Sequence, residues 1–295
     1  MADPPPISFR DSQKTFPTLK AVGRRFAPWA DTYHFVMMRT WAEFFALAAV
    51  GYVLVNVFFA LLYMLQEGAI AHAESGFEHA FYFSVQTLGT IGFGVMSPGT
   101  RYGHLVVTVE SLVGIFSIAL ITGMTFARFA RPSAKVLFAA KAVVARRDGE
   151  QYLMFRMANW RHNQILEAYL RVTVLVSHTS REGHEMRIPV DLPLVRDRTA
   201  MFGLTWLAMH KIDEKSPFHG GPSSIDRLRA QSALIFLSLT GVDETIGQNV
   251  HARHSYALDD IAWDSIFVDV LRVGDDGGRV LDYSHFHDVA RQPPA

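Results

Sequence analysis

The sequence predicts a membrane α-helical unit followed by an all-β domain. Two apolar stretches, residues 41–65 and 105–127, are each long enough to cross a bilayer as a helix. After residue 132 the chain changes to short strand-like runs separated by turn signals. Between the two apolar stretches lies "GTIGFG", residues 89–94, which is unusually rich in glycine. We therefore expect two transmembrane helices, a re-entrant segment between them, and a C-terminal β-sandwich.

The overall charge gives no indication of a polyanionic partner. The 295 residues carry 28 Lys plus Arg and 28 Asp plus Glu, so we expect no nucleic acid to bind. There is no cysteine in the chain, which excludes disulfides, thiolate metal sites and cysteine nucleophiles.

Each apolar stretch contains a single charged residue, Glu43 in the first and Glu110 in the second. As a helix rising about 1.5 Å per residue, the first would be roughly 37 Å long, which exceeds a hydrocarbon core of about 30 Å. It begins at residue 41 and is too long for a signal peptide. We interpret both stretches as transmembrane helices rather than as a buried hairpin of a soluble protein.

The basic residues lie outside the segment that joins the two helices. Residues 67–100 contain no Lys or Arg, whereas basic residues cluster before the first helix and after the second. By the positive-inside rule, both termini of this multi-pass protein are expected in the cytoplasm.

The chain before the first span divides into two parts. Residues 1–20 are Pro-rich and polar at the start, which is typical of a poorly ordered segment. Residues 24–40 mix Arg with Trp, Tyr and Phe, which is typical of an amphipathic helix in the headgroup layer. The alternative is a cytoplasmic beginning of the first span.

A short helix is expected immediately before the glycine-rich stretch. Residues 76–88 place Phe77, Ala80, Phe81 and Val85 at helical spacing, but the segment is too short to cross a membrane. Irregular backbone at membrane depth is tolerated only where it is buried in protein or lines a water-filled path. The two segments together therefore indicate a re-entrant loop.

The region 132–295 is typical of an all-β domain with one helix. Asp148-Gly149, residues 181–183 and "GDDGG" at 274–278 are turn signals between strand-like runs. The one helix is expected from Ser223 to Gln231, with Ser223 as its N-terminal cap. Short strands at this spacing predict a β-sandwich.

The glycine-rich stretch favours a cation over a phosphate. Its glycines have the reverse of the dinucleotide-loop spacing, a helix rather than a strand precedes it, and no Lys or Arg lies near it. Alternating glycines let successive residues take backbone conformations of alternating hand, so that their carbonyl oxygens point to one side. These oxygens and the Thr90 hydroxyl form part of a cation site. One chain supplies only part of a ring, so we expect copies to assemble around an axis, and fourfold symmetry gives each ion about eight oxygens.

Residues 90–94, "TIGFG", resemble the selectivity filter of potassium channels. Together with four other stretches, they are similar to the inward rectifier potassium channels, in particular the prokaryotic KirBac family. The resemblance covers residues 24 to 288 and implies a homotetramer that conducts K⁺ across a bacterial inner membrane. The four stretches are "ARFARP" (127–132), "LMFRMANWRHNQILEA" (153–168), "MHKIDEKSP" (209–217) and "HARHSYALDDIAW" (251–263).

The resemblance also implies a domain plan. After a cytoplasmic segment at 1–23 it places a slide helix at 24–40, a transmembrane pore domain at 41–131 and an immunoglobulin-like cytoplasmic domain at 132–295. The pore domain consists of an outer helix (41–66), a pore helix (77–88), the filter (90–94) and an inner helix (101–129).

Individual roles follow from the resemblance by position. The backbone carbonyls of Thr90, Ile91, Gly92 and Phe93 would coordinate K⁺ in a filter that ends at Gly94. Phe126 matches a hydrophobic gate at the bundle crossing. The inner-helix glycines, Gly114 and Gly123, match hinge or close-packing positions, or are small residues at helix contacts. Two acidic residues, Glu167 and Asp269, match or lie close to positions that line the cytoplasmic pore.

Three positions depart from the family pattern. The glutamate and arginine that often support the filter are replaced by Gln86 and Val95. In the pore cavity, Ile118 stands where strong rectifiers carry an acidic residue. We therefore expect only weak block by cytoplasmic Mg²⁺ or polyamines, and hence weak rectification.

Basic residues near the expected membrane surface are candidates for binding anionic lipid headgroups. The alternative is that they only set the topology. The candidates are Arg24, Arg25, Arg128, Arg131, Lys135 and Lys141.

An enzyme and a sensor are the rival functions. His251 and His254 are three residues apart, which on a strand places them on opposite faces, and no nucleophile-elbow or zinc-protease motif is present. We assign no catalytic residue, expect no cofactor, and take K⁺ as the permeant ligand. The alternative function is a non-conducting membrane sensor whose β domain binds a ligand, although the filter would then have no purpose. No span carries repeated arginines, so a voltage sensor is not expected.

Overall fold

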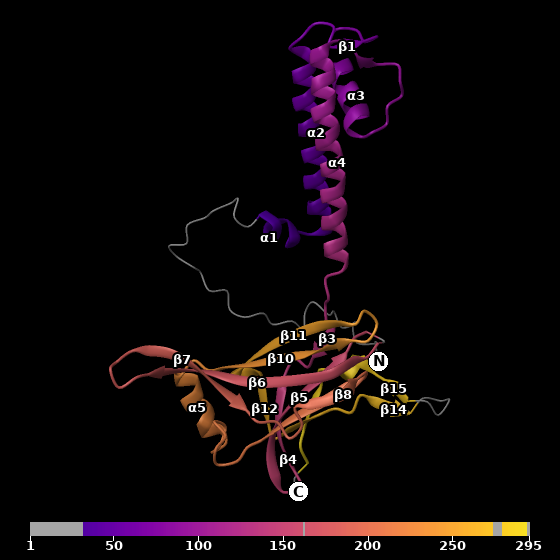
Figure 1. Ribbon diagram of the computed structural model, residues 1–295. Helices are drawn as coiled ribbons and strands as arrows, with labels where there is room; N and C mark the ends of the chain where they lie inside the picture. Colours follow the sequence, from indigo (N-terminus) through magenta and orange to yellow (C-terminus); the bar gives the residue numbers. More distant parts are fainter. Residues whose placement is uncertain (1–31, 162, 274–278, 294–295) are drawn as a thin grey trace. The chain divides into compact units, whose positions relative to one another are not determined.

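The computed structural model describes residues 32–161, 163–273 and 279–293. The chain divides at Pro132 into two compact units, a helical unit before it and a β-rich unit after it (Figure 1). The expected segment 1–23, the first part of the expected slide helix, and Arg24 and Arg25 lie outside the described residues.

The helical unit contains four helices in its described part. They are α1 (Thr32–Met37), α2 (Trp41–Met64), α3 (Phe77–Leu88) and α4 (Arg101–Phe129). Both α2 and α4 are long and apolar enough to cross a membrane, and the bounds of α3 and α4 coincide with those expected for the pore and inner helices.

Local capping explains where these helices begin and end. The Thr40 side chain accepts from the Glu43 backbone N–H, and the Glu43 carboxylate accepts from the Thr40 N–H, so a capping box starts α2. The expectation that the first helix runs to residue 40 is therefore wrong, because Thr40 caps the next helix and α1 ends at Met37. The expected end of the outer helix at residue 66 is also corrected to Met64, with Leu65 as its cap.

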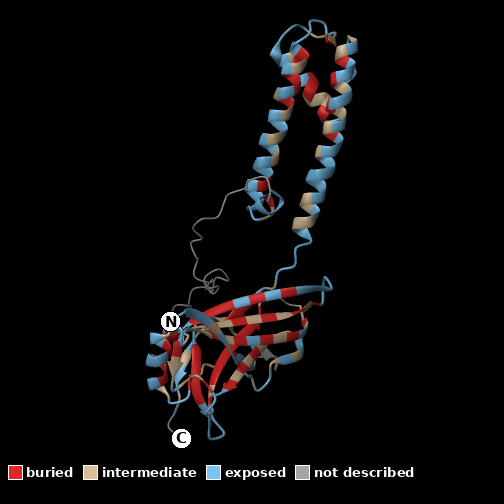
Figure 2. Ribbon diagram, turned by 60° about the vertical axis from the view of Figure 1, so that its left-hand side comes forward, coloured by how far each residue is buried: buried red, intermediate tan, exposed pale blue. Residues whose placement is uncertain are grey.

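The short helix α3 packs against the two long helices with one face. Its buried face packs against α2 and α4 at one end of the unit, where most of the buried side chains of this unit gather (Figure 2). The rest of α2 and α4 is mainly exposed in a single chain, which for apolar helices indicates contact with lipid or with other copies. The cluster consists of Phe59, Ala60, Tyr63, Ala69, Ala80, Phe83 and Val106.

The β unit is a sandwich of two five-stranded sheets, in which β8 and β9 pair with inner strands. One large core, which includes Phe155, Leu170, Trp206, Leu237 and Tyr256, takes side chains from both sheets. The expected β-sandwich is confirmed. One sheet holds β12 (Ile261–Trp263), β4 (Ala142–Arg147), β5 (Glu150–Asn159), β3 (Val136–Phe138) and β9 (Thr205–Lys211). The other holds β11 (Gln248–Ala257), β10 (Leu234–Asp243), β6 (Ile165–Thr179), β7 (Glu185–Leu192) and β8 (Arg198–Phe202).

Small two-stranded pairings complete the fold. In the helical unit β1 (Ile70–Ala71) pairs with β2 (Ser97–Pro98). In the β unit β13 (Ser265–Phe267) pairs with β16 (Val289–Arg291), and β14 (Leu271–Val273) pairs with β15 (Arg279–Leu281). The β14–β15 pairing agrees with the expected hairpin, although its turn at 274–278 lies outside the described residues.

One turn signal behaves as expected and one cap does not. Asp148 and Gly149, with φ of +50° and +80°, join β4 to β5, as a two-residue hairpin turn requires. The helix α5 spans Pro222–Ala230 and has Gly221 as its N-cap. The expectation that Ser223 caps this helix is wrong, because Pro222 already occupies the first helical position, where proline fits best.

Two buried polar side chains hold irregular segments of the β unit in place. His210 Nδ1 donates to the Pro193 carbonyl (2.8 Å), and the Ser216 hydroxyl donates to Nε2 (2.9 Å), so a neutral imidazole satisfies both partners. Burial lowers the pKa of His210. The Arg156 guanidinium donates to the carbonyls of Val268 (2.5 Å) and Phe286 (3.2 Å), and burial lowers its pKa to about 10.

Candidate functional site

The glycine-rich stretch begins directly where α3 ends. The Gln86 carbonyl accepts from the backbone N–H groups of Ile91 (2.8 Å) and Gly92 (3.3 Å), and the Thr87 carbonyl accepts from Thr90 N–H (3.1 Å). These bonds use carbonyls at the C-terminal end of the helix that would otherwise have no partner. The backbone of Gln86, rather than its side chain, therefore connects α3 to the loop.

The backbone of this loop alternates in hand. Thr90, Gly92 and Gly94 have φ of +56°, +56° and +84°, whereas Ile91 and Phe93 are not in the positive-φ region. A β-branched residue such as threonine rarely adopts positive φ, and such strain concentrates at functional sites. This alternation is the conformation that a column of carbonyl oxygens requires.

Three large apolar side chains in the loop and directly after it are exposed in a single chain. Ile91, Phe93 and Val95 are 51%, 73% and 70% exposed. Three large apolar side chains exposed at the end of a helical membrane unit indicate a surface for another molecule.

The two inner-helix glycines lie in different surroundings. A Cβ added at Gly114 would lie 2.7 Å from the Leu88 carbonyl oxygen, so α4 can approach the end of α3 only because residue 114 has no side chain. A Cβ added at Gly123 would meet nothing within 4 Å. Close packing therefore accounts for Gly114, and no contact within one chain accounts for Gly123.

A buried carboxyl group that the sequence did not assign to the site lies behind α3. Glu110 on α4 is fully buried; the Tyr63 hydroxyl on α2 donates to its Oε2 at 2.5 Å, and its Oε1 contacts the Ser84 hydroxyl on α3. The signal available in the sequence was a lone acidic residue within an apolar span, which by itself marks a functional position.

Two further residues on α4 are exposed in a single chain. Ile118 is 51% exposed and Phe126 is 73% exposed, the latter near the C-terminal end of the helix. Their side chains are free to face a central path between copies or the lipid.

Arg128 makes specific contacts with the segment before α2. Its guanidinium donates to the carbonyls of Val36 (3.0 Å) and Arg39 (2.6 Å) and lies over the ring of Trp41, 4.7 Å from its centroid. Its neighbour Arg131 reaches the Met37 carbonyl at 3.5 Å and is exposed. The expected lipid contact of Arg128 is therefore in competition with these protein contacts, whereas Lys135 and Lys141 in the β unit are exposed.

The two acidic residues expected at the cytoplasmic pore are both exposed. Glu167 has φ of +47° at a bulge in β6, opposite Gly241 of β10, and the bulge changes the direction of its side chain. Asp269 accepts from the Leu271 N–H at 3.0 Å and lines a cavity of about 400 Å³ together with Arg147 and Arg156. Nothing in one chain brings Glu167 and Asp269 into contact.

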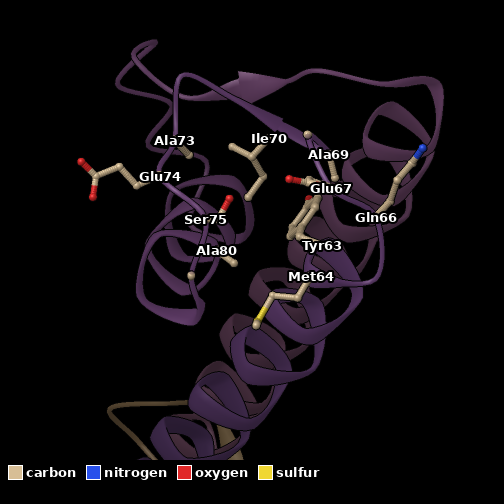
Figure 3. Close-up of a pocket in the computed structure, with 12 residues that line it drawn as sticks. Tyr63, Met64, Gln66, Glu67, Ala69, Ile70, Ala73, Glu74, Ser75 and Ala80 are labelled. Atoms are coloured by element: carbon tan, nitrogen blue, oxygen red, sulfur yellow. The ribbon is translucent and has the colours of Figure 1, made fainter.

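A second cavity, of about 450 Å³, lies between the end of α2 and the start of α3. Figure 3 shows Tyr63, Ile70 and Ala80 around it, while the carboxylate of Glu74 points away. Within the described ranges no group of three or more His, Asp or Glu side chains could hold a metal ion.

Comparison with known proteins gives matches along nearly the whole chain. Residues 136–294 match the family model described as the inward rectifier potassium channel C-terminal domain, and residues 44–131 match the model described as ion channel. The inward rectifier potassium channel Kirbac3.1 of Paramagnetospirillum magnetotacticum is 39% identical over 262 residues, which is 88% of each chain. The human G protein-activated inward rectifier potassium channel 3 is 30% identical over 274 residues, covering 85% of this chain and 68% of the relative. A solved structure of the sporulation control protein Spo0M from Bacillus subtilis has a TM-score of 0.25 at 9% identity, over 44% of this chain and 49% of its own, which is too low to indicate a shared fold.

Proposed function

This chain belongs to the inward rectifier potassium channel family, and from that premise we propose how its own residues conduct and control K⁺. The protein is a potassium channel. We assign the filter to residues 90–94, with K⁺ coordinated by the backbone carbonyls of Thr90, Ile91, Gly92 and Phe93. No cofactor is proposed, and K⁺ is the permeant ligand.

One observation carries this assignment: positive φ at residues 90, 92 and 94 with the intervening residues outside that region. Successive residues of alternating hand can direct their carbonyls to the same side, which a chain of uniform L-residue conformation cannot do. Carbonyl oxygens replace the hydration shell of K⁺ in such filters. The loop follows a helix that packs with one face against two spans, a position where irregular backbone is tolerated if it lines a path for water and ions.

We propose that the channel is a homotetramer. One chain offers a single column of oxygens, whereas an ion in the filter needs about eight, which four copies supply. Contact with further copies is supported by the exposed side chains of Ile91, Phe93 and Val95. It is also supported by the exposed parts of α2 and α4 that lie away from α3. We propose a bacterial inner membrane as its location, and the distribution of basic residues supports both termini in the cytoplasm.

We assign the gate to Phe126. Four exposed phenylalanines at the end of α4 would form a hydrophobic constriction that closes by dewetting. Glu167 and Asp269 would attract cations at the cytoplasmic end of the path. Because the cavity position Ile118 is apolar, block by Mg²⁺ or polyamines would be weak.

We propose that anionic lipids bind the basic residues that lack protein contacts as close as those of Arg128. Arg131, Lys135 and Lys141 are exposed, and each basic group near a charged surface contributes about 1 kcal/mol. Arg128 is assigned instead to holding α1, because its guanidinium already donates to two carbonyls. Arg24 and Arg25 stay candidates from the sequence.

The test of the filter is K⁺ or Rb⁺ uptake into liposomes that contain the purified protein, with and without barium. Gly92→Ala should abolish K⁺ selectivity and leave the tetramer intact, since an L-residue is strained at φ of +56° even though the space is open. Gly51→Ala on α2 is the matched control, because its added Cβ meets nothing within 4 Å. Unchanged selectivity in Gly92→Ala would refute the carbonyl column.

A non-conducting sensor is not favoured, because the relatives that match are channels. Absence of barium-sensitive flux in several lipid compositions would reverse this preference.

A further inference from the structure

A cluster of fully buried polar side chains lies behind the helix that leads to the filter. Asn56 on α2, Ser84 on α3 and Glu110 on α4 are all 0% exposed, and Tyr63 on α2 is 2% exposed. Each of the three helices contributes at least one member. A polar group buried within a membrane is costly unless it is hydrogen-bonded, so such groups are kept where they serve a function.

The contacts within this cluster form one continuous chain. The Asn56 side-chain N–H donates to the Tyr52 carbonyl (2.8 Å), and its Oδ1 faces the Ser84 hydroxyl (3.0 Å). The same hydroxyl contacts Oε1 of Glu110, whose Oε2 accepts from the Tyr63 hydroxyl at 2.5 Å. Among the described residues the side chains bonded to Glu110 are these two hydroxyls, and neither carries a positive charge.

Counting hydrogen atoms identifies the protonation state of Glu110. Ser84 has one hydroxyl hydrogen but faces two oxygens, Asn56 Oδ1 and Glu110 Oε1. The Asn56 amide cannot be reversed, because its oxygen would then face the Tyr52 carbonyl oxygen. Ser84 therefore donates to Asn56, and the hydrogen between Ser84 and Glu110 must belong to Glu110. A neutral carboxylic acid satisfies every contact, whereas a carboxylate leaves two oxygens facing each other without a hydrogen.

We propose that Glu110 is a neutral carboxylic acid that positions the pore helix, and through it the filter. This inference rests on the proposed filter assignment. The path is short: Glu110 holds Ser84, and two residues later the Gln86 carbonyl accepts from the Ile91 N–H of the filter. The contact between Glu110 and Ser84 supports the pore helix from the inner helix. Gln86 and Val95 cannot provide such support, because they cannot form an ion pair beside the filter.

A second contact on the same faces fixes the register of the two helices. One turn after Glu110 on α4, Gly114 has no side chain and lies against the Leu88 carbonyl. Leu88 lies one turn after Ser84 on α3. Residues four apart on a helix lie on one face. The contacts at Ser84 and Leu88 therefore determine how far α3 is inserted along α4, and thereby the height of the filter.

The functional test compares two substitutions of nearly equal size in the full-length channel in liposomes. Glu110→Leu removes the hydrogen donated to the Ser84 oxygen and the acceptor of the Tyr63 hydroxyl. We therefore expect the K⁺ to Na⁺ permeability ratio to fall roughly tenfold, the factor that corresponds to about one hydrogen bond. Glu110→Gln keeps a donor for Ser84 and an acceptor for Tyr63, and should restore most of the lost ratio. Thr108→Val on the same helix is the control, because Thr108 is exposed and bonds only to its own helix at the His104 carbonyl.

A spectroscopic test addresses the proton directly and does not depend on ion flux. The infrared difference between wild type and Glu110→Gln in liposomes should contain the carbonyl stretch of a protonated carboxylic acid. A difference spectrum for Glu43→Gln should show a carboxylate band instead, because Glu43 is exposed in a capping box. Hydrogen exchange of the α3 backbone should be faster in Glu110→Leu than in Glu110→Gln.

The outcomes separate this inference from the proposed filter. A carboxylate band for Glu110, or a wild-type permeability ratio in Glu110→Leu of a conducting channel, would overturn the positioning role. If the wild-type protein conducts no K⁺, the proposed filter assignment is refuted. The infrared band then still decides whether Glu110 is neutral, and hydrogen exchange of α3 decides whether Glu110 holds that helix. If Glu110→Leu does not assemble, the infrared band and the permeability ratio of Glu110→Gln decide.

Discussion

Replacing each inner-helix glycine by alanine provides a matched pair of perturbations. Gly114 and Gly123 lie on the same helix, so both changes add one methyl group and give the same intrinsic gain in helix propensity, about 1 kcal/mol. At Gly123 nothing lies within 4 Å of the added carbon, so that gain is the whole expected effect. We expect Gly123→Ala to be slightly stabilised.

At Gly114 the added carbon would lie 2.7 Å from the Leu88 carbonyl oxygen and 3.4 Å from the Leu88 carbonyl carbon. Both are backbone atoms and cannot rotate away, so α3 must move from α4. Overpacking of this kind costs about 1–3 kcal/mol. The free energy of unfolding of Gly114→Ala should therefore lie about 1–3 kcal/mol below that of Gly123→Ala.

Chemical denaturation of the full-length protein in detergent micelles measures this difference, and Rb⁺ uptake into liposomes gives its functional result. Because Leu88 directly precedes Gly89 and the proposed filter, uptake should fall in Gly114→Ala while the proposed tetramer persists. Equal stability of the two variants would refute the close-packing role of Gly114. Reduced uptake in Gly123→Ala at unchanged stability would identify residue 123 as a hinge.

Three further predictions concern side chains outside the filter. Burial lowers the pKa of His210, so the unfolded chain binds a proton at this residue more readily, and the β unit should lose stability as pH falls below about 6.5. When the free energy of unfolding of the full-length protein is followed against pH, His210→Gln should remove the part of the pH dependence that His210 causes. An unaltered pH dependence in His210→Gln would contradict this reasoning. Arg156→Ala should destabilise the protein by about 2–4 kcal/mol, since the buried carbonyls of Val268 and Phe286 lose their donor; denaturant titration measures this, and a loss below about 1 kcal/mol would count against it. Arg128→Lys keeps the charge but loses the planar fork in which two separate nitrogens each donate to one carbonyl. Hydrogen exchange of α1 should therefore rise nearly as much as in Arg128→Ala, whereas wild-type exchange in the lysine variant would indicate that charge alone matters.

Much of the fold could be predicted because its signals are local. The two spans follow from hydrophobic length, and the β4–β5 turn follows from Asp148-Gly149, whose φ values a hairpin requires. The cap of α5 was mistaken because Gly221, with Pro222 after it, caps that helix two residues before the serine expected to do so. At the filter, the spacing of glycines already indicated alternating backbone hand, and the structure adds Thr90 to the residues with positive φ.

The sequence by itself determined the membrane class, the order of the helices and the β-sandwich domain that follows them, and the position proposed for the filter loop, because apolar length, turn residues and glycine spacing act along short stretches. Only the tertiary structure decided which residues support that loop. Glu110 meets Ser84 and Tyr63 across 26 and 47 residues, and Arg128 meets Val36 across 92. The rotation of a nearly uniformly apolar helix about its axis is not encoded in its own pattern, so partners that lie across helices are fixed only when the helices pack together.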